Sequence, residues 1–180
     1  FFLVVFLSWV PNGYSCTNFP INIGALDTTL DRILVESLSV LINERTGVTV
    51  GVHYFKTWQE LDTAVQEKRL EITIENTSTS LQQQDIAVSP DPQQNLEKLK
   101  ELYKQKEMIW LKPFVFVAKD EKGSDVLTAP VISRKSLAQF PALPRLIAKL
   151  TKKIDDQTLE KLIQDVQGSA KPKNVAKDYL

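Results

Sequence analysis

Two short polar stretches hold the side chains that could bind a small molecule. Asp27 to Thr29 reads DTT and Glu75 to Thr79 reads ENTST, and each follows an apolar run. Hydroxyl, amide and carboxylate groups are those that fix a small polar ligand in a pocket. The candidate ligand-binding residues come from these stretches and the strand before the first: Ala25, Asp27, Thr28, Thr29, Asn76, Thr77, Ser78 and Thr79.

The same side chains also suit a purely structural role. Ser, Thr, Asp and Asn accept hydrogen bonds from the free N–H groups at the start of a helix. Asp27, Thr28, Thr29, Thr77 and Thr79 could therefore do no more than cap two helices. At the level of sequence both interpretations stay open.

Few residues support catalysis or metal binding. Cys16 is the only cysteine and His53 the only histidine, so one chain cannot assemble a disulfide framework or a Cys/His metal cluster. We expect no metal and no other cofactor. His53 lies within a strand pattern and is interpreted as structural. Acidic residues such as Asp31 fall on predicted helix surfaces, where charges are usually solvated. With no nucleophile or acid–base pair to name, the chain is not expected to be an enzyme.

Composition places the chain among ordinary globular domains. It has 180 residues, of which 43% are hydrophobic and 24% charged, as expected for one α/β or α+β domain. The 22 Lys and Arg residues balance the 22 Asp and Glu residues, so the formal net charge is +0. Without a basic excess to neutralise phosphates, nucleic acid is not an expected partner.

The N-terminal segment is apolar and short. Phe1 to Val10 reads FFLVVFLSWV, too few residues for a membrane span, and resembles the hydrophobic region of a secretory signal. Cys16 follows it, where bacterial lipoproteins are cleaved and acylated. The alternative is a plain cleaved signal with a cysteine nearby. We expect a signal-like segment over 1–16, one domain over 17–180, an extracytoplasmic location, and membrane contact only through a possible lipid anchor at Cys16.

Strand and helix patterns alternate in the first half of the chain. The predicted order is strand 21–26, a helix from Thr29 that stops at Gly47, strand 48–55, a helix opened by a Thr57–Glu60 capping box, strand 70–74 and a helix from Thr77. This alternation favours right-handed βαβ units and a parallel sheet. Ligands bind such sheets beyond the carboxyl ends of the strands, and both polar stretches fall there.

The second half contains a different set of elements. A polar loop precedes a charged helix over 95–107, and apolar runs over 109–117 and 126–133 could be antiparallel neighbours. Pro113 and Pro130 lack the N–H that a ladder bond needs, which predicts strand ends, bulges or an edge for them. From Ser136 onward the pattern is helical.

Several of these segments resemble one protein family. INIGALDTTLDRIL (21–34) is similar to a strand and helix that typically read IxIGSKNFTEQxIL, and LDTAVQEKRLEITIENTSTSL (61–81) to ALxxGEIDIYPEYTGTAL. IWLKPFVF (109–116) resembles a WLKPLGF strand, and the segment from Ala129 onward resembles the family's closing part. The family is that of the substrate-binding proteins of glycine betaine, carnitine and choline ABC importers.

The resemblance implies a fold. Members of this family have two α/β lobes with the ligand held between them, and the second lobe normally follows the WLKP strand. This chain passes almost at once from that strand to the closing segment. We therefore expect an α/β fold, one lobe of a periplasmic-binding-protein-like (type II) fold, with a mostly parallel central sheet of about five strands and helices on both faces. The implied order is second, first and third strands in parallel, then 126–133 antiparallel beside 109–116.

The chain departs from the family at the ligand-contacting positions. Thr73 and Asn76 replace tyrosines, Asp27 and Thr28 replace Asn and Phe, and Ser78 replaces Gly, whereas Thr29, Thr77 and Thr79 match. Each lost cation–π contact weakens binding of a quaternary ammonium group by about 0.5 to 2 kcal/mol. Tight binding of glycine betaine is therefore not expected, and ligand affinity should be reduced or altered.

Two functional hypotheses follow. The resemblance implies an extracytoplasmic solute-binding domain that serves transmembrane transport of osmolytes or similar small polar solutes, with a small polar or quaternary ammonium ligand and an ABC permease as partners. The alternative is a protein interaction module, in which the face vacated by the second lobe meets another protein or another copy of the chain.

Overall fold

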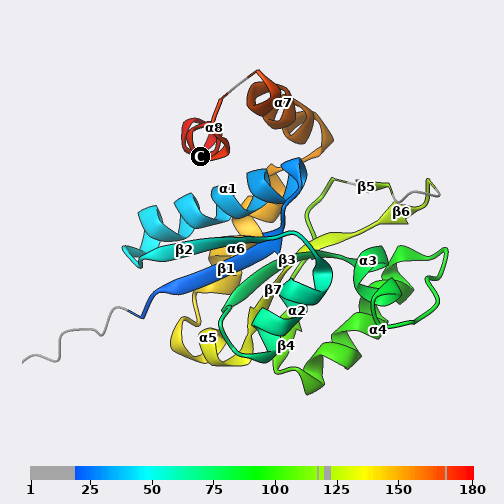
Figure 1. Cartoon of the computed structure of the whole chain (residues 1–180). Coiled ribbons are helices and arrows are strands. Elements are labelled where there is room, and N and C mark those ends of the chain that lie inside the picture. Colours follow the sequence, from blue (N-terminus) through cyan, green and yellow to red (C-terminus); the bar gives the residue numbers. More distant parts are fainter. Residues whose placement is uncertain (1–18, 117, 120–122, 169) are drawn as a thin grey trace, which may run out of the picture.

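The computed structural model describes residues 19–116, 118–119, 123–168 and 170–180 (Figure 1). The signal-like segment and Cys16 lie outside the described residues, so their predictions stay predictions. Within the described part, none of the helices combines the length and apolar character that crossing a membrane requires.

A five-stranded mixed sheet forms the centre of the fold. Its strands lie in the order β2-β1-β3-β7-β4. β1 is parallel to β2 and β3, whereas β7 is antiparallel to both β3 and β4. The predicted α/β class and strand order are confirmed. The strands are β1 (Ile21–Leu26), β2 (Val50–Phe55), β3 (Ile72–Asn76), β4 (Met108–Trp110) and β7 (Thr128–Ser133), with β5 (Ala118–Lys119) and β6 (Asp125–Val126) forming a separate two-stranded sheet.

Helices cover both faces of the sheet, as predicted. Figure 1 shows α1 and α6 on one face and α2, α3 and α4 on the other. Beyond α1 lie α7 and α8, away from the sheet. The helices are α1 (Thr29–Thr46), α2 (Trp58–Gln66), α3 (Thr77–Gln82), α4 (Pro92–Gln105), α5 (Arg134–Gln139), α6 (Leu143–Lys153), α7 (Asp156–Gln167) and α8 (Pro172–Tyr179).

Each face of the sheet has its own apolar core. Ile23 and Ile72 pack with Leu38 of α1 and Ile147 of α6. On the opposite face Val131 belongs to a cluster that α2 and α4 complete. Successive residues of a strand point to opposite faces of the sheet, and helices cover both faces. The strands β1 and β3 are therefore buried on both sides.

The predicted helix ends are found where the sequence places them. Thr28 is the N-cap of α1, and Gly47 ends that helix with φ 71°, a left-handed conformation that glycine adopts without a Cβ clash. Thr57 and Glu60 form the capping box that opens α2. The two turns that follow the first two strands are therefore fixed by local sequence.

The prediction that Pro130 lies at a strand end, a bulge or a sheet edge is wrong. Pro130 lies inside β7, between β3 and β4, opposite Ile74. The backbone N–H of Leu111 donates to the Pro130 carbonyl at 2.9 Å, but Pro130 has no N–H to return the bond. β4 ends at Trp110, so regular pairing stops where the proline would leave it incomplete.

Candidate ligand-binding site

A cavity of about 350 Å³ lies at the carboxyl ends of β1 and β3. This is where the sequence predicts a crevice, and the starts of α1 and α3 meet there. Residues from three parts of the chain line it: Leu26, Thr28, Leu30, Asp31, Asn76, Ser78, Thr79, Gln82, Ala118, Lys119, Val126 and Thr128.

Half of the eight candidate residues reach this cavity. Thr28 contributes from the start of α1, and Asn76, Ser78 and Thr79 contribute from the end of β3 and the first turn of α3. The structure thus brings two polar stretches, far apart in sequence, onto one wall. A ligand-binding role for these four residues stays a prediction.

The other four candidates lie elsewhere. Ala25 is fully buried in the core. Thr77 is fully buried too, and its hydroxyl accepts a hydrogen bond from the Leu127 N–H at 3.2 Å. Asp27 forms an ion pair with Arg32, with 2.5 Å between Oδ1 and Nε. Thr29 is the exposed first residue of α1. None of the four lines the cavity, so nothing in the geometry supports a ligand contact by them.

Asp31 is a lining residue that sequence reasoning assigned to a solvated surface. The Thr28 hydroxyl donates to Asp31 Oδ2 at 2.8 Å and accepts from the Asp31 N–H at 3.1 Å, which ties the carboxylate to the helix start. Burial raises the pKa of Asp31 to about 6, and the bond from Thr28 offsets part of that rise. A half-buried carboxylate therefore stands in the cavity wall.

Thr128 is the second unforeseen polar group in the wall. It stands opposite Asn76 in the antiparallel pairing of β3 with β7. Its side chain is 2% exposed, and its hydroxyl has no hydrogen-bond partner among the described residues. A buried hydroxyl without a partner costs about 1 to 3 kcal/mol, so this group is suited to a partner that enters from the cavity.

Local hydrogen bonds hold the part of the cavity wall that α3 contributes. Asn76 caps α3, because its Oδ1 accepts from the Thr79 N–H at 2.8 Å. The Asn76 amide nitrogen is then left as a donor. Gln82 Nε2 lies 3.5 Å from Ser78 Oγ, at the far limit of a hydrogen bond.

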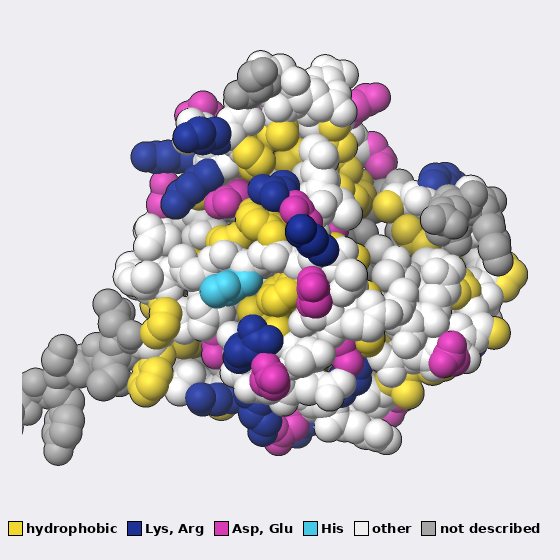
Figure 2. Space-filling model, in the orientation of Figure 1, with side chains coloured by type: hydrophobic (Ala, Val, Ile, Leu, Met, Phe, Trp, Pro, Cys, Tyr) yellow, Lys and Arg dark blue, Asp and Glu magenta, His cyan; other side chains and the backbone are white. Residues whose placement is uncertain are grey.

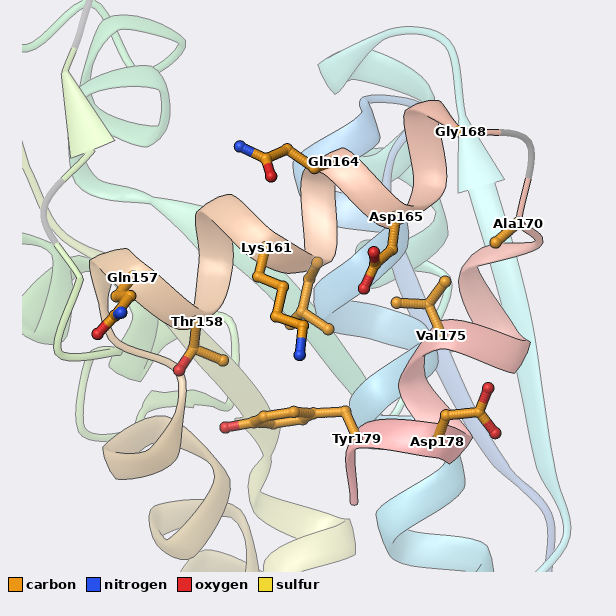
Figure 3. Close-up of a pocket in the computed structure, with 11 residues that line it drawn as sticks. Gln157, Thr158, Lys161, Gln164, Asp165, Gly168, Ala170, Val175, Asp178 and Tyr179 are labelled. Atoms are coloured by element: carbon orange, nitrogen blue, oxygen red, sulfur yellow. The ribbon is translucent and has the colours of Figure 1, made fainter.

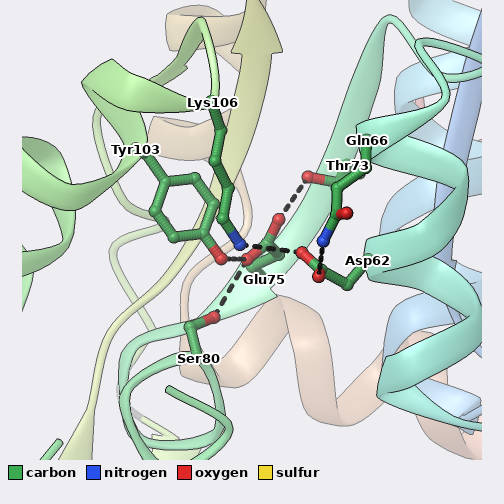
Figure 4. A network of polar contacts seen from close by, with 7 residues as sticks. All are labelled: Asp62, Gln66, Thr73, Glu75, Ser80, Tyr103 and Lys106. Atoms are coloured by element: carbon green, nitrogen blue, oxygen red, sulfur yellow. Dashed lines mark hydrogen bonds and ion pairs between the residues drawn. The ribbon is translucent and has the colours of Figure 1, made fainter.

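A buried polar network fixes the junction of β3 and α3 from the opposite face of the sheet. Figure 4 shows Thr73, Ser80 and Tyr103 converging on Glu75. Their hydroxyls donate to the Glu75 carboxylate at 2.6, 3.0 and 2.5 Å. Burial raises the pKa of Glu75, and these bonds act against the rise. Ser80 belongs to α3 and Tyr103 to α4, so the network locks α3 in place behind the cavity.

The described residues of the lining include no aromatic side chain and little free positive charge. Lys119, the only Lys or Arg among these described lining residues, forms an ion pair with Asp125 of β6. Trp58 and Trp110 are not among the described lining residues: Trp110 is buried edge-on to Tyr103, and Trp58 lies under the Lys106 ammonium group. Across the described ranges, His, Cys, Asp and Glu form no group that could hold a metal ion.

A larger hollow, of about 770 Å³, lies between α7 and α8. Figure 3 shows Lys161 and Asp165 of α7 facing Val175, Asp178 and Tyr179 of α8. Most of its wall consists of exposed side chains on two outer helices. Among the described residues that line it, no buried polar atom lacks a partner. The smaller cavity at the sheet is therefore the better candidate for a specific site.

Two signals in the sequence could have found the missed residues. Asp31 follows the N-cap Thr28 at the spacing of a capping box, which ties its side chain to the turn after β1. Thr128 becomes visible only once 126–133 is paired with β3, because the register then sets it against Asn76. The first signal is local and the second depends on tertiary pairing.

The fold described above is similar to that of several solved structures. This chain has the fold of the substrate-binding proteins of membrane transporters. Apo YehZ from Escherichia coli matches with a TM-score of 0.79 and 14% identity, covering 89% of this chain and 97% of that chain. A protein described as a glycine betaine/carnitine/choline ABC transporter matches with a TM-score of 0.74 and 15% identity, over 91% and 97%.

A more distant likeness extends to a second transporter type. The periplasmic ectoine-binding protein of the TeaABC TRAP transporter of Halomonas elongata matches with a TM-score of 0.51 and 10% identity, over 89% of this chain and 90% of that chain. No protein-family model matches the sequence, and no curated protein matches it either. The similarity is therefore one of fold, in agreement with the family resemblance of the sequence motifs.

Proposed function

We propose that this chain is an extracytoplasmic solute-binding domain that captures a small polar solute for transport across a membrane, with an ABC permease as its partner. The observation that carries the proposal is the cavity wall shared by Thr28, Asp31, Asn76 and Thr128. It joins two helix starts and a buried hydroxyl at the edge of the sheet where α/β folds bind ligands. The solute is an osmolyte or a similar small polar molecule.

The ligand preference of this site differs from that of an aromatic cage. An aromatic face attracts a quaternary ammonium group through its quadrupole, and the described lining has no such face. Hydroxyl, amide and carboxylate groups take its place. Weak binding of glycine betaine, choline and carnitine is therefore part of the proposal.

A thermal-shift titration tests the proposal. The protein is titrated with amino acids, polyols, ectoine-like osmolytes and quaternary ammonium compounds. A ligand at about a hundredfold excess over its dissociation constant adds about 2.7 kcal/mol of stability. For a domain of this size, the unfolding midpoint should rise by about 5 to 10 °C. No rise with any compound of the panel would contradict the proposed function.

Two matched variants link any shift to the cavity. Gln82 is exposed and lines the cavity, whereas its neighbour Gln83 is exposed and does not. Gln82→Trp should fill the cavity mouth and abolish the ligand-induced shift, and Gln83→Trp should leave the shift unchanged. If both variants respond like the wild type, the ligand binds elsewhere.

The interaction module stays an alternative with less support. A face that once met a second lobe should expose large apolar side chains. Among the described residues, the exposed large hydrophobics are Phe19 at 53% and Val115 at 50%. Figure 2 shows apolar and charged side chains interspersed over one face. Sedimentation at high concentration decides the self-association form of this alternative, which requires a dimer.

A further inference from the structure

We infer that the cavity selects a solute whose cationic group carries N–H donors, with Asp31 as its counter-ion and Thr128 as a further hydrogen-bond partner. Primary or secondary ammonium and guanidinium compounds belong to this class, and quaternary ammonium compounds do not. The inference rests on the proposed function and specifies the solute class for the same site.

The first argument is the hydrogen-bond acceptor capacity that the Asp31 carboxylate retains. Oδ2 accepts from the Thr28 hydroxyl at 2.8 Å. No other hydrogen bond or ion pair of this side chain is present among the described residues. The nearest cations along the chain and in the wall are engaged, because Arg32 pairs with Asp27 and Lys119 with Asp125. A half-buried carboxylate with free acceptor capacity gains most from a cation that also donates a hydrogen bond.

The second argument is the Thr128 hydroxyl. It can accept from one N–H group while donating elsewhere, and it has no partner in the described part of the protein. A trimethylated nitrogen has no N–H and would leave this buried hydroxyl unsatisfied. An ammonium or guanidinium group would satisfy it. The two solute types therefore differ in whether they can form a hydrogen bond with the unsatisfied Thr128 hydroxyl.

The third argument is the absence of an aromatic contact. Recognition of quaternary ammonium groups relies on aromatic faces, and none lines this cavity among the described residues. At about 350 Å³ the cavity is near the small end of ligand pockets, which suits a solute of amino-acid size. Carboxylate, hydroxyl and amide groups around a cavity of this size favour a ligand that donates N–H hydrogen bonds.

Pairs of solutes with one skeleton and different nitrogen substitution test this inference. Glycine is compared with glycine betaine, ethanolamine with choline, and 4-aminobutyrate with its trimethylated form, by calorimetry on the wild-type protein. In at least one pair, the N–H member should bind with a dissociation constant about tenfold lower or more. Agmatine serves as the guanidinium probe.

Variants assign the preference to the two side chains. Asp31→Asn should reduce the preference to within about twofold, because the carboxylate is lost and the shape is kept. Glu44→Gln removes the same charge from an exposed site on the same helix and should leave the preference intact. Thr128→Val should weaken the N–H member and spare the trimethylated one.

The outcomes separate the inference from the proposed function. Tighter binding of the trimethylated members, binding of an uncharged solute alone, or an unchanged preference in Asp31→Asn would overturn the inference and leave solute binding in place. Absence of binding by every pair and every panel compound would overturn both.

Discussion

Thr128 stands directly opposite Asn76 where β7 pairs with β3, and residues so paired share a face of the sheet. The same face continues through the buried pairs of Ile74 with Pro130 and Ile72 with Ile132. The row of paired residues thus changes from apolar to polar at its last pair. That change places two polar side chains at the edge of a core that α1 covers, where the cavity opens.

Removing the Thr128 hydroxyl should stabilise the unliganded protein. Thr128→Val keeps the shape of the side chain and deletes a buried group without a partner. A gain of about 1 kcal/mol is expected, or a rise of about 2 to 4 °C in the unfolding midpoint. Thermal unfolding without ligand measures it. A fall of similar size would mean that this hydroxyl already has a partner in the folded protein.

Thr73→Val is the same substitution at another buried threonine, and its effect on stability should have the opposite sign. Thr73 is also fully buried in the sheet, but its hydroxyl donates to Glu75 at 2.6 Å. The same substitution should lower stability by about 1 to 3 kcal/mol, because the buried Glu75 carboxyl group loses a hydrogen-bond partner. Denaturant unfolding of both variants compares the two signs. Equal effects would contradict the distinction drawn between the two hydroxyls.

Tyr103→Phe tests the network behind the cavity. The Tyr103 hydroxyl donates to the buried Glu75 carboxylate, whose pKa burial raises. Because the folded pKa of Glu75 lies above its unfolded value, its contribution to stability is lost as pH rises through the folded pKa. Removing a donor should raise that pKa further and cost about 1 to 3 kcal/mol, with a larger loss at pH values where Glu75 is ionised than at those where it is protonated. A loss independent of pH would contradict this.

Asp31 should give the unliganded protein a stability that falls between about pH 4 and pH 7. Its pKa is raised from 3.8 to about 6 by burial. A raised folded pKa contributes stability that is complete below the unfolded value and lost as pH rises through the folded value. Asp31→Asn should therefore gain on the wild type across this range, by on the order of 1 to 2 kcal/mol after screening.

Unfolding of both proteins at several pH values measures this difference. Lys119, paired with Asp125, is the other charged residue among the described residues of the cavity wall and is common to both proteins. A bound cation should favour ionised Asp31 and make ligand affinity rise with pH through about 6. A constant difference in stability would show that Asp31 titrates like a solvated residue.

Asp27→Asn should leave ligand affinity within about twofold of the wild type. Asp27 was a candidate from sequence, but it pairs with Arg32 and does not line the cavity. The pair lies at the surface, where solvent screens the attraction between its charges, so stability should change little. Calorimetry alongside Asp31→Asn gives the comparison, and a large loss of affinity in Asp27→Asn would restore the original assignment.

Local sequence patterns and the family resemblance together predicted most of the fold. β1 spans the predicted residues, Gly47 and the Thr57–Glu60 box end and start helices as expected, and the sheet order follows the family resemblance. Pro130 was misplaced because the absence of one ladder bond is tolerated where β4 ends. That detail depends on the neighbouring strand and not on the proline.

The position of the cavity could be predicted from sequence more readily than the residues that line it. Thr28 and Asn76 cap helices and also line the cavity, so the capping interpretation of Thr28 is confirmed, and a ligand-binding role for both residues stays a prediction. Thr77 differs, because its side chain turns to the Leu127 backbone. The end of a predicted strand indicates which residues lie near a crevice. The direction of each side chain depends on pairing partners that are distant in the sequence, so local sequence does not predict it.

Amide chemical-shift mapping with the tightest-binding solute of the panel tests the central claim most directly. If the cavity at the ends of β1 and β3 is the binding site, the shifts should cluster at Thr28, Asp31, Asn76, Thr79 and Thr128 and should be absent from α7 and α8. Shifts centred on Lys161, Asp165 and Tyr179, around the hollow between those two helices, would contradict the account and move the site to the outer helices.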